Sequence, residues 1–178
     1  ADGHNVTAIT LPGLESADTD RSSVTLSDHV DAICDVVTAA GSPVVLAVHS
    51  ASGFSGYAAS DRLPELVAAM VYVDSAPGIP PLDANFTDAE KPLVWEEVAE
   101  EENLDGLSEE QIETFRQRAV PVPGGVVREK IELTNDARRD IPSTIIATGF
   151  TSEQYKDTVQ EDYSVIAGVP ELRNLNWI

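Results

Sequence analysis

The chain has 178 residues, and 42% of them are hydrophobic, which is enough for one domain with a buried core. Its 31 acidic and 11 basic residues give a net charge of −20, so its surface repels nucleic acids and anionic membranes, and neither is expected as a partner. A single cysteine, Cys34, excludes an internal disulfide, and no run is apolar enough to span a membrane or to resemble a signal peptide, which together predict a cytoplasmic protein.

The first elements are predicted as a strand over residues 5–11, ended by a Pro-Gly turn, and then a helix. The helix begins near Thr25, because Thr25 and Asp28 have the spacing of a capping box. Apolar residues then recur every three or four positions up to Ala40, which is one face of an α-helix, and Gly41 is predicted to end it.

Residues 44–53, VVLAVHSASG, are the most informative segment of the chain. A β-branched run ends at Ser50 and is followed by small residues, as where a nucleophilic serine is mounted between a strand and a helix. In the G-x-S-x-G elbow the residues two before and two after the serine are small, because strand and helix nearly touch. Here those positions hold Val48 and Ser52, with Gly53 next, so the motif is degenerate.

The surroundings of Ser50 predict a strand over residues 43–48, a helix over residues 54–60 and a second apolar strand over residues 67–73. This is a βαβ unit, and near-continuous apolar strands are typical of a parallel sheet covered on both faces. The alternative interpretation is a crossover connection that contains a serine without a chemical role.

The second half of the chain is predicted to leave the sheet and return to it. Residues 83–118 have the character of an acidic amphipathic helix, with a capping box at Ser108 and Gln111, and residues 121–125 are predicted as a loop. A strand over 142–148, a helix over 153–167 ended by Gly168 and a strand over 172–178 follow. We therefore expect a single domain in three parts, a core (1–82), a helical cap insertion (83–125) and the rest of the core (126–178).

Three segments together resemble the α/β-hydrolase superfamily, particularly its small capped esterase-like and lyase-like members: Leu11-Pro12-Gly13, residues 48–53 and residues 71–78. The resemblance covers most of the chain. It implies an α/β fold with three layers, a mostly parallel sheet and a helical cap, incomplete at both ends.

By this resemblance Ser50 is the nucleophile, and the backbone N–H of Ala51 is one of two oxyanion donors. Many relatives carry the acid of the triad just after the strand that corresponds to residues 142–148, where Glu153 is the nearby carboxylate. Other relatives carry it one strand earlier, where this chain has Asp74. We favour Asp74, because an acidic residue at position 153 also suits the first turn of a helix.

None of the three histidines suits the role of the base. His49 is adjacent to Ser50, His29 lies on the early helix, and His4 precedes the first strand. The resemblance places the base after the last strand, beyond Ile178, and places further strands before the chain begins. We therefore expect these 178 residues to be an internal fragment of a longer hydrolase, or to need complementation, and to be inactive alone.

The function predicted on this basis is acyl transfer by a serine hydrolase acting on a small apolar ester or related carbonyl substrate, with no metal and no organic cofactor. One alternative is a hydroxynitrile-lyase-like enzyme, and another is a non-catalytic binding protein, which the degenerate elbow favours. No particular oligomeric state is predicted. Four apolar residues of the cap could line the pocket, although packing of an amphipathic helix is the better explanation for each: Phe86, Leu93, Trp95 and Phe115.

Overall fold

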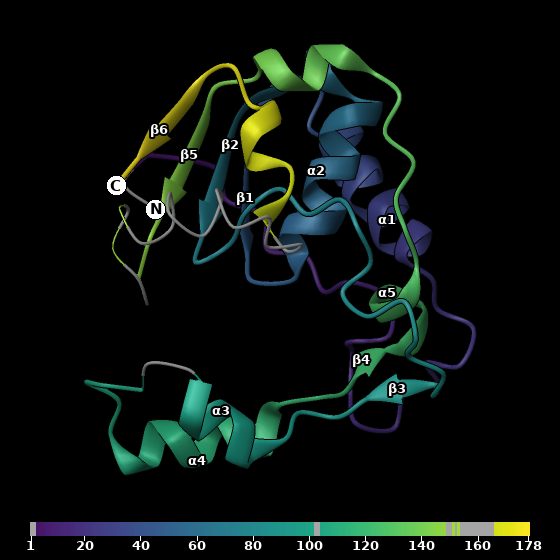
Figure 1. Ribbon diagram of the computed structural model, residues 1–178, viewed down its shortest axis with the longest axis vertical. Coiled ribbons are helices and arrows are strands. Elements are labelled where there is room, and N and C mark those ends of the chain that lie inside the picture. The colour runs from purple at the N-terminus through teal and green to yellow at the C-terminus, as the bar shows by residue number, and fades with distance from the viewer. Residues whose placement is uncertain (1–2, 102–103, 149–150, 152, 154–165) are drawn as a thin grey trace.

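The computed structural model describes residues 3–101, 104–148, 151, 153 and 166–178 (Figure 1). Its centre is a four-stranded sheet in the order β1-β2-β5-β6, and every neighbouring pair is parallel. The register pairs His49 with Val73 and Val73 with Ile146, so the carboxyl ends of three strands lie level. The strands are β1 (Val44–His49), β2 (Val67–Val73), β5 (Ser143–Ile146) and β6 (Leu175–Trp177).

Helices α1 (Leu26–Ala39) and α2 (Ser52–Arg62) pack against each other on one side of this sheet (Figure 1). The predicted capping box of α1 is confirmed, since the Thr25 hydroxyl accepts from Asp28 N and the Asp28 carboxylate accepts from Thr25 N. Gly41 follows the helix with a φ of 67°. The expectation of an α/β fold with a mostly parallel sheet is therefore confirmed.

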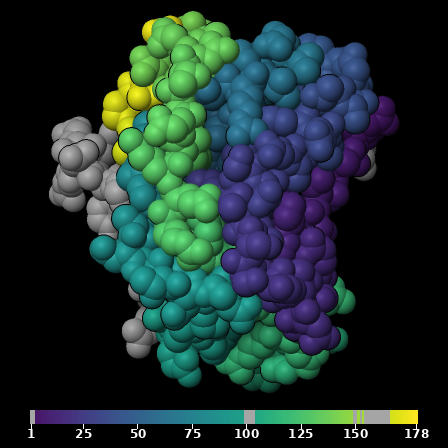
Figure 2. All heavy atoms as spheres, turned by 90° about the vertical axis from the view of Figure 1, so that its right-hand side faces the viewer, coloured from purple at the N-terminus to yellow at the C-terminus, as the bar shows by residue number. Residues whose placement is uncertain are grey.

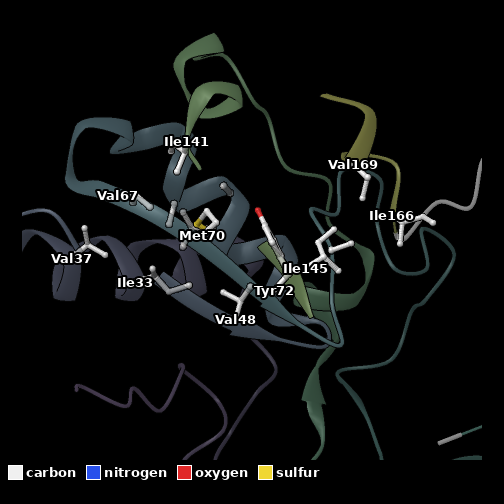
Figure 3. Packing of buried hydrophobic residues seen from close by; sticks show 14 residues of the cluster. Ile33, Val37, Val48, Val67, Met70, Tyr72, Ile141, Ile145, Ile166 and Val169 are labelled. Atoms are coloured by element: carbon white, nitrogen blue, oxygen red, sulfur yellow. The ribbon is translucent and has the colours of Figure 1, made fainter. Parts of the chain in front are cut away.

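The hydrophobic core lies between the sheet and these helices (Figure 3). Each element supplies the residues that face it at the spacing its geometry requires, three to four in the helix and two in the strands. Ile33 and Val37 come from α1, Val48 from β1, Met70 and Tyr72 from β2 and Ile145 from β5.

Residues 83–125, the cap segment, are not one long helix. Helices α3 (Trp95–Glu101) and α4 (Glu109–Arg118) lie apart from the sheet, and β3 (Glu90–Lys91) pairs antiparallel with β4 (Val122–Pro123) (Figure 1). The helix predicted from residue 83 is wrong before residue 95, where Pro92 lacks the N–H that a helix interior needs. The capping box of α4 at Ser108 and Gln111 is confirmed.

The loop predicted over residues 121–125 is also wrong, because β4 occupies part of it and helix α5 (Gly124–Arg128) starts directly after β4. Three of the four Pro and Gly residues that suggest a loop are buried: Pro123, Gly124 and Gly125. Tertiary pairing with β3 overrides the local preference. From α5 the chain runs along α1, as the side view shows (Figure 2).

The strand predicted over residues 5–11 does not form. The segment has no regular structure, residues 5–10 are exposed, and no described strand pairs with the outer edge of β1, where Val45 is 64% exposed. A strand needs a partner for its backbone N–H and C=O groups, and alternating apolar residues alone do not supply one. The helix predicted over 153–167 falls mostly on residues 154–165, which lie outside the described residues, whereas Glu153 itself is helical.

At the amino end of the sheet, a buried guanidinium joins three segments. Arg138, in η2 (Asp136–Asp140), donates to Asp61 Oδ1 at 3.2 Å and to Glu171 Oε2 at 2.6 Å. Asp61 belongs to α2, and Glu171 belongs to η4 (Val169–Glu171). The ring of Tyr57 lies under Arg138, and its hydroxyl donates to Glu171 at 3.0 Å. In the described part of the chain, no helix is long and apolar enough to cross a lipid bilayer.

Candidate active site

Ser50 and Asp74 occupy equivalent places at the ends of two adjacent parallel strands. Ser50 follows β1 with a φ of 49°, and Asp74 follows β2 with a φ of 43°. They are the non-glycine residues with positive φ in the described part of the chain, and such a conformation costs about 1–2 kcal/mol for an L-residue. The two strands are in register at His49 and Val73, so the two residues are neighbours at the carboxyl edge.

Backbone hydrogen bonds hold both turns in place. Ser50 N donates to Val73 O at 3.4 Å, and Asp74 N donates to Ile146 O at 2.9 Å, so each turn is tied to the next strand. The Ser75 hydroxyl also donates to Ser50 O at 2.6 Å. A strained serine that its surroundings hold in this way is what a nucleophile elbow requires.

The loop after β2 lies against the start of α2, and this contact explains Gly53. A Cβ atom on Gly53 would stand 2.4 Å from Ala76 O and 2.4 Å from Ser75 Oγ. Position 53 therefore carries the close approach that the elbow motif usually assigns to the residue before it. Ser52 is tolerated because its hydroxyl turns back to β1, where it donates to His49 O at 2.7 Å and accepts from His49 N at 2.9 Å.

Val48 is tolerated two residues before the serine for a similar reason. A Cβ atom on Gly56, one turn into α2, would stand 2.4 Å from Val48 Cγ1, so the missing side chain in the helix accommodates the extra bulk in the strand. Neither Gly56 nor Ser75 belongs to the elbow that the sequence predicts. The spacing of Gly53 and Gly56 was the available signal, since it puts two small residues on one face of the helix.

Ala51 is the N-cap residue of α2, directly after Ser50. No acceptor for its backbone N–H is found in the described part of the chain. The first N–H groups of a helix lack intrahelical partners and carry the positive end of the helix dipole. This N–H is thus available to a negatively charged oxygen bound beside Ser50.

The side chain of His29 is buried and hydrogen-bonded to the loop that precedes α1. It is 3% exposed on α1, and its Nε2 donates to Pro12 O at 2.8 Å. Burial lowers the pKa of His29 below its usual value, although the hydrogen bond to Pro12 opposes the shift, so the ring is held neutral. His49 is exposed at the end of β1, and Glu153 is exposed and helical. Among the described residues, no hydrogen bond joins the side chain of any of these three to Ser50.

The aromatic residues of the cap segment pack on each other. The rings of Trp95 and Phe115 lie 5.5 Å apart at an interplanar angle of 74°, and the Arg116 guanidinium lies 4.4 Å from the centre of the Trp95 ring. Leu93 and Phe115 remain 44% and 41% exposed, and Phe86 is partly buried. Mutual packing of α3 and α4 thus accounts for Trp95, and a pocket-lining role for these residues stays a prediction.

Residues 1–169 match a family model described as the alpha/beta hydrolase family. The chain belongs to the α/β-hydrolase family. This α/β-hydrolase is similar in structure to an extracellular alpha/beta-hydrolase from a Paenibacillus species, at a TM-score of 0.65 and 16% identity over 90% of this chain and 72% of that one. The described strand order and the turn at Ser50 agree with that membership.

Two plant proteins are similar as well. Tomato methylketone synthase I has a TM-score of 0.67 and 14% identity, with 99% of this chain and 78% of that chain covered. A methylesterase from Arabidopsis has a TM-score of 0.69 and 14% identity, with 97% of this chain and 76% of that chain covered. At these identities the likeness shows a shared fold alone. No curated protein sequence matches the chain.

Proposed function

We propose that this α/β-hydrolase is a serine hydrolase that transfers the acyl group of a small, largely apolar ester or related carbonyl compound. The observation that supports this most strongly is the left-handed backbone of Ser50 on a tight turn between β1 and α2. Such a turn presents a serine hydroxyl at the carboxyl edge of the sheet, where ligands of α/β folds bind. The proposed chemistry uses no metal and no organic cofactor.

In the proposed reaction Ser50 Oγ attacks the carbonyl carbon of the substrate and gives its proton to a base. The Ala51 N–H stabilises the oxyanion that forms on the carbonyl oxygen. The base returns the proton to the leaving alcohol, and water then hydrolyses the acyl-serine by the same steps in turn. We propose that the base is a histidine other than His29, since the His29 ring is hydrogen-bonded to Pro12 O.

The proposed acid of the triad is Asp74, which would accept a hydrogen bond from the imidazole and hold it in the correct tautomer. Its place beside Ser50 at the carboxyl edge supports this choice over Glu153. Asp74→Asn should lower the turnover of an ester by about 10²–10⁴-fold, whereas Glu153→Gln should stay within about twofold of the wild-type rate. The reverse result would assign the role to Glu153.

The cap segment is proposed to cover the site, with Phe86, Leu93, Trp95 and Phe115 toward the substrate.

The proposed location is the cytoplasm, which the composition supports through its single cysteine. That cysteine, Cys34, is half-buried on α1, where burial raises the pKa of its thiol and so keeps it unreactive.

The test is covalent labelling of the complete gene product with a fluorophosphonate, followed by peptide mass analysis. Label on Ser50, and its loss together with a decrease in p-nitrophenyl ester turnover of about 10³-fold or more in Ser50→Ala, supports the proposal. A folded protein that does not label at Ser50 contradicts it and favours a binding protein that keeps the fold.

A hydroxynitrile-lyase-like activity is the second candidate, because the same triad would serve acid–base chemistry without an acyl intermediate. Labelling at Ser50 alone does not separate the two. Release of cyanide from a cyanohydrin, with no ester turnover by the same preparation, would assign the lyase activity instead.

A further inference from the structure

Arg21 lies in the loop before α1 and is almost completely buried, with 3% of its surface exposed. Its guanidinium donates to five oxygen acceptors from three segments of the chain. Within its own loop it binds the carbonyl oxygens of Ser16, Ala17 and Thr19, the last at 2.8 Å. These bonds fold the loop around the guanidinium, which is preorganised as a planar fork.

The remaining two hydrogen bonds of Arg21 reach both of the segments that join helices α3 and α4 to the core. Nη1 donates to Glu90 Oε2 at 3.2 Å in β3, and Nε donates to Pro121 O at 3.0 Å, one residue before β4. Helices α3 and α4 lie between β3 and β4 in the sequence. One side chain therefore contacts both segments of what we call the neck, residues 88–91, which include β3, and residues 121–125, which include β4.

The neck is packed against the loop as closely as backbone allows. Gly13 has a φ of 84°, and a Cβ atom there would stand 2.7 Å from Pro123 Cγ. Within the neck itself the two segments are equally close, since a Cβ atom on Gly124 would stand 2.0 Å from Asp88 O, and Gly124 N donates to Ala89 O at 2.7 Å. The neck thus has a defined seat on the core at the position of Arg21.

Helices α3 and α4 depend on this seat for their orientation. In the described part of the chain, neither packs extensively against the sheet, α1 or α2. They lie beyond the end toward which β5 points, which is the carboxyl edge that carries Ser50 (Figure 1). Because the neck is their connection at both ends, whatever fixes the neck fixes the helices.

We propose that Arg21 is a positioning residue that seats the neck and thereby holds α3 and α4 over the substrate site at Ser50. This inference rests on the proposed hydrolase function for its effect on substrate, but the seating of the neck does not. A loosened neck leaves the machinery at Ser50 intact and weakens the contacts between substrate and cap, so it acts on KM and not on kcat.

The test compares Arg21→Lys with Arg173→Lys in the complete gene product. Lysine keeps the charge and most of the volume but cannot reach five acceptors on both sides of the neck. Arg173 is an exposed arginine that donates to Asp136 and Asp140 at the other end of the molecule, so the same substitution there controls for loss of an arginine fork. Hydrogen exchange of residues 88–91 and 122–125 is measured, and then the kinetics of p-nitrophenyl esters.

For Arg21→Lys we expect neck amides to exchange about tenfold faster while β1 and β2 stay as in the wild type, and KM to rise about fivefold with kcat within about twofold. Arg173→Lys should change neither. Unchanged neck exchange, or equal acceleration in the neck and in β1 and β2, overturns the seating role. A loosened neck with unchanged KM overturns its effect on substrate.

A second variant keeps the inference testable if Arg21→Lys does not fold. Glu90→Gln removes the charged partner on the neck but leaves an amide oxygen to accept the hydrogen bond, and Glu90 is 46% exposed, so the fold is retained. Its neck exchange should rise less than in Arg21→Lys, and no rise at all counts against the proposal. If wild-type protein turns over no ester, the proposed function and the substrate effect fail together, while the exchange data still decide whether Arg21 seats the neck.

Discussion

The carboxyl end of the sheet carries the strained residues Ser50 and Asp74, whereas the amino end carries the buried ion pairs of Arg138 with Asp61 and Glu171. At the amino end, charged groups join α2 to the segments that lead into β5 and β6. At the carboxyl end, the backbone takes a conformation that it would leave if it were free. A strained turn persists only where the rest of the fold over-determines it. The ion pairs at the amino end therefore help to keep the strained turns at the carboxyl end.

The pKa values at the amino end agree with this view. Burial alone would raise the pKa of Glu171, but hydrogen bonds from Arg138 and Tyr57 hold it below its usual value. Burial raises the pKa of Tyr57 to about 12. The carboxylate thus stays charged and the phenol stays neutral over the physiological range, and the network keeps one arrangement of donors and acceptors.

The largest expected loss of stability comes from removing the centre of this network. Arg138→Met should lower the free energy of unfolding by about 3–5 kcal/mol, because it leaves two carboxylates without their buried guanidinium. Denaturant unfolding of the complete protein measures it, with Arg173→Met, at an exposed ion pair, as the control that should change little. A small loss of unfolding free energy in Arg138→Met would mean that the buried ion pairs at the amino end contribute little to stability.

Gly53→Ala tests the carboxyl end and should have an intermediate effect. The added methyl group meets Ala76 O, which is backbone, so the substitution should cost about 1–3 kcal/mol and displace the elbow. Gly56→Ala in the same helix meets the Val48 side chain instead. We expect similar destabilisation from both, but a decrease in the rate of Ser50 labelling only from Gly53→Ala. Equal labelling of both folded variants would contradict the assignment of Gly53 to the elbow.

The smallest effect is expected from pH, through His29. Its pKa in the folded protein lies below the value of about 6.5 in the unfolded chain, so the unfolded chain binds the proton more readily. Stability from the neutral ring is present above about pH 6.5 and is lost as the pH falls from there toward the lower folded pKa. Melting curves between pH 7 and pH 5 should show this loss, and His29→Gln should reduce it. An identical pH dependence in the variant would exclude His29 as the cause.

The two capping boxes, at Thr25 and Ser108, and the strand that ends at Ser50 could be predicted from the sequence because they depend on residues a few positions apart. The apolar run of β2 was predicted with its correct bounds for the same reason. Ser50 itself was identified as the candidate nucleophile, despite a degenerate motif, from its place between a strand and a helix.

Other features depended on contacts between distant segments. Residues 5–11 have a strand-like pattern and no strand partner among the described residues, and residues 121–125 look like a loop until β3 pairs with β4. Val48 is acceptable beside Ser50 because of Gly56, and Arg21 has its role through Glu90 and Pro121. Local hydrogen bonds and periodicity therefore determined the elements and the candidate serine. The tertiary structure decided which elements found partners, because pairing and close packing join residues whose proximity no local pattern encodes.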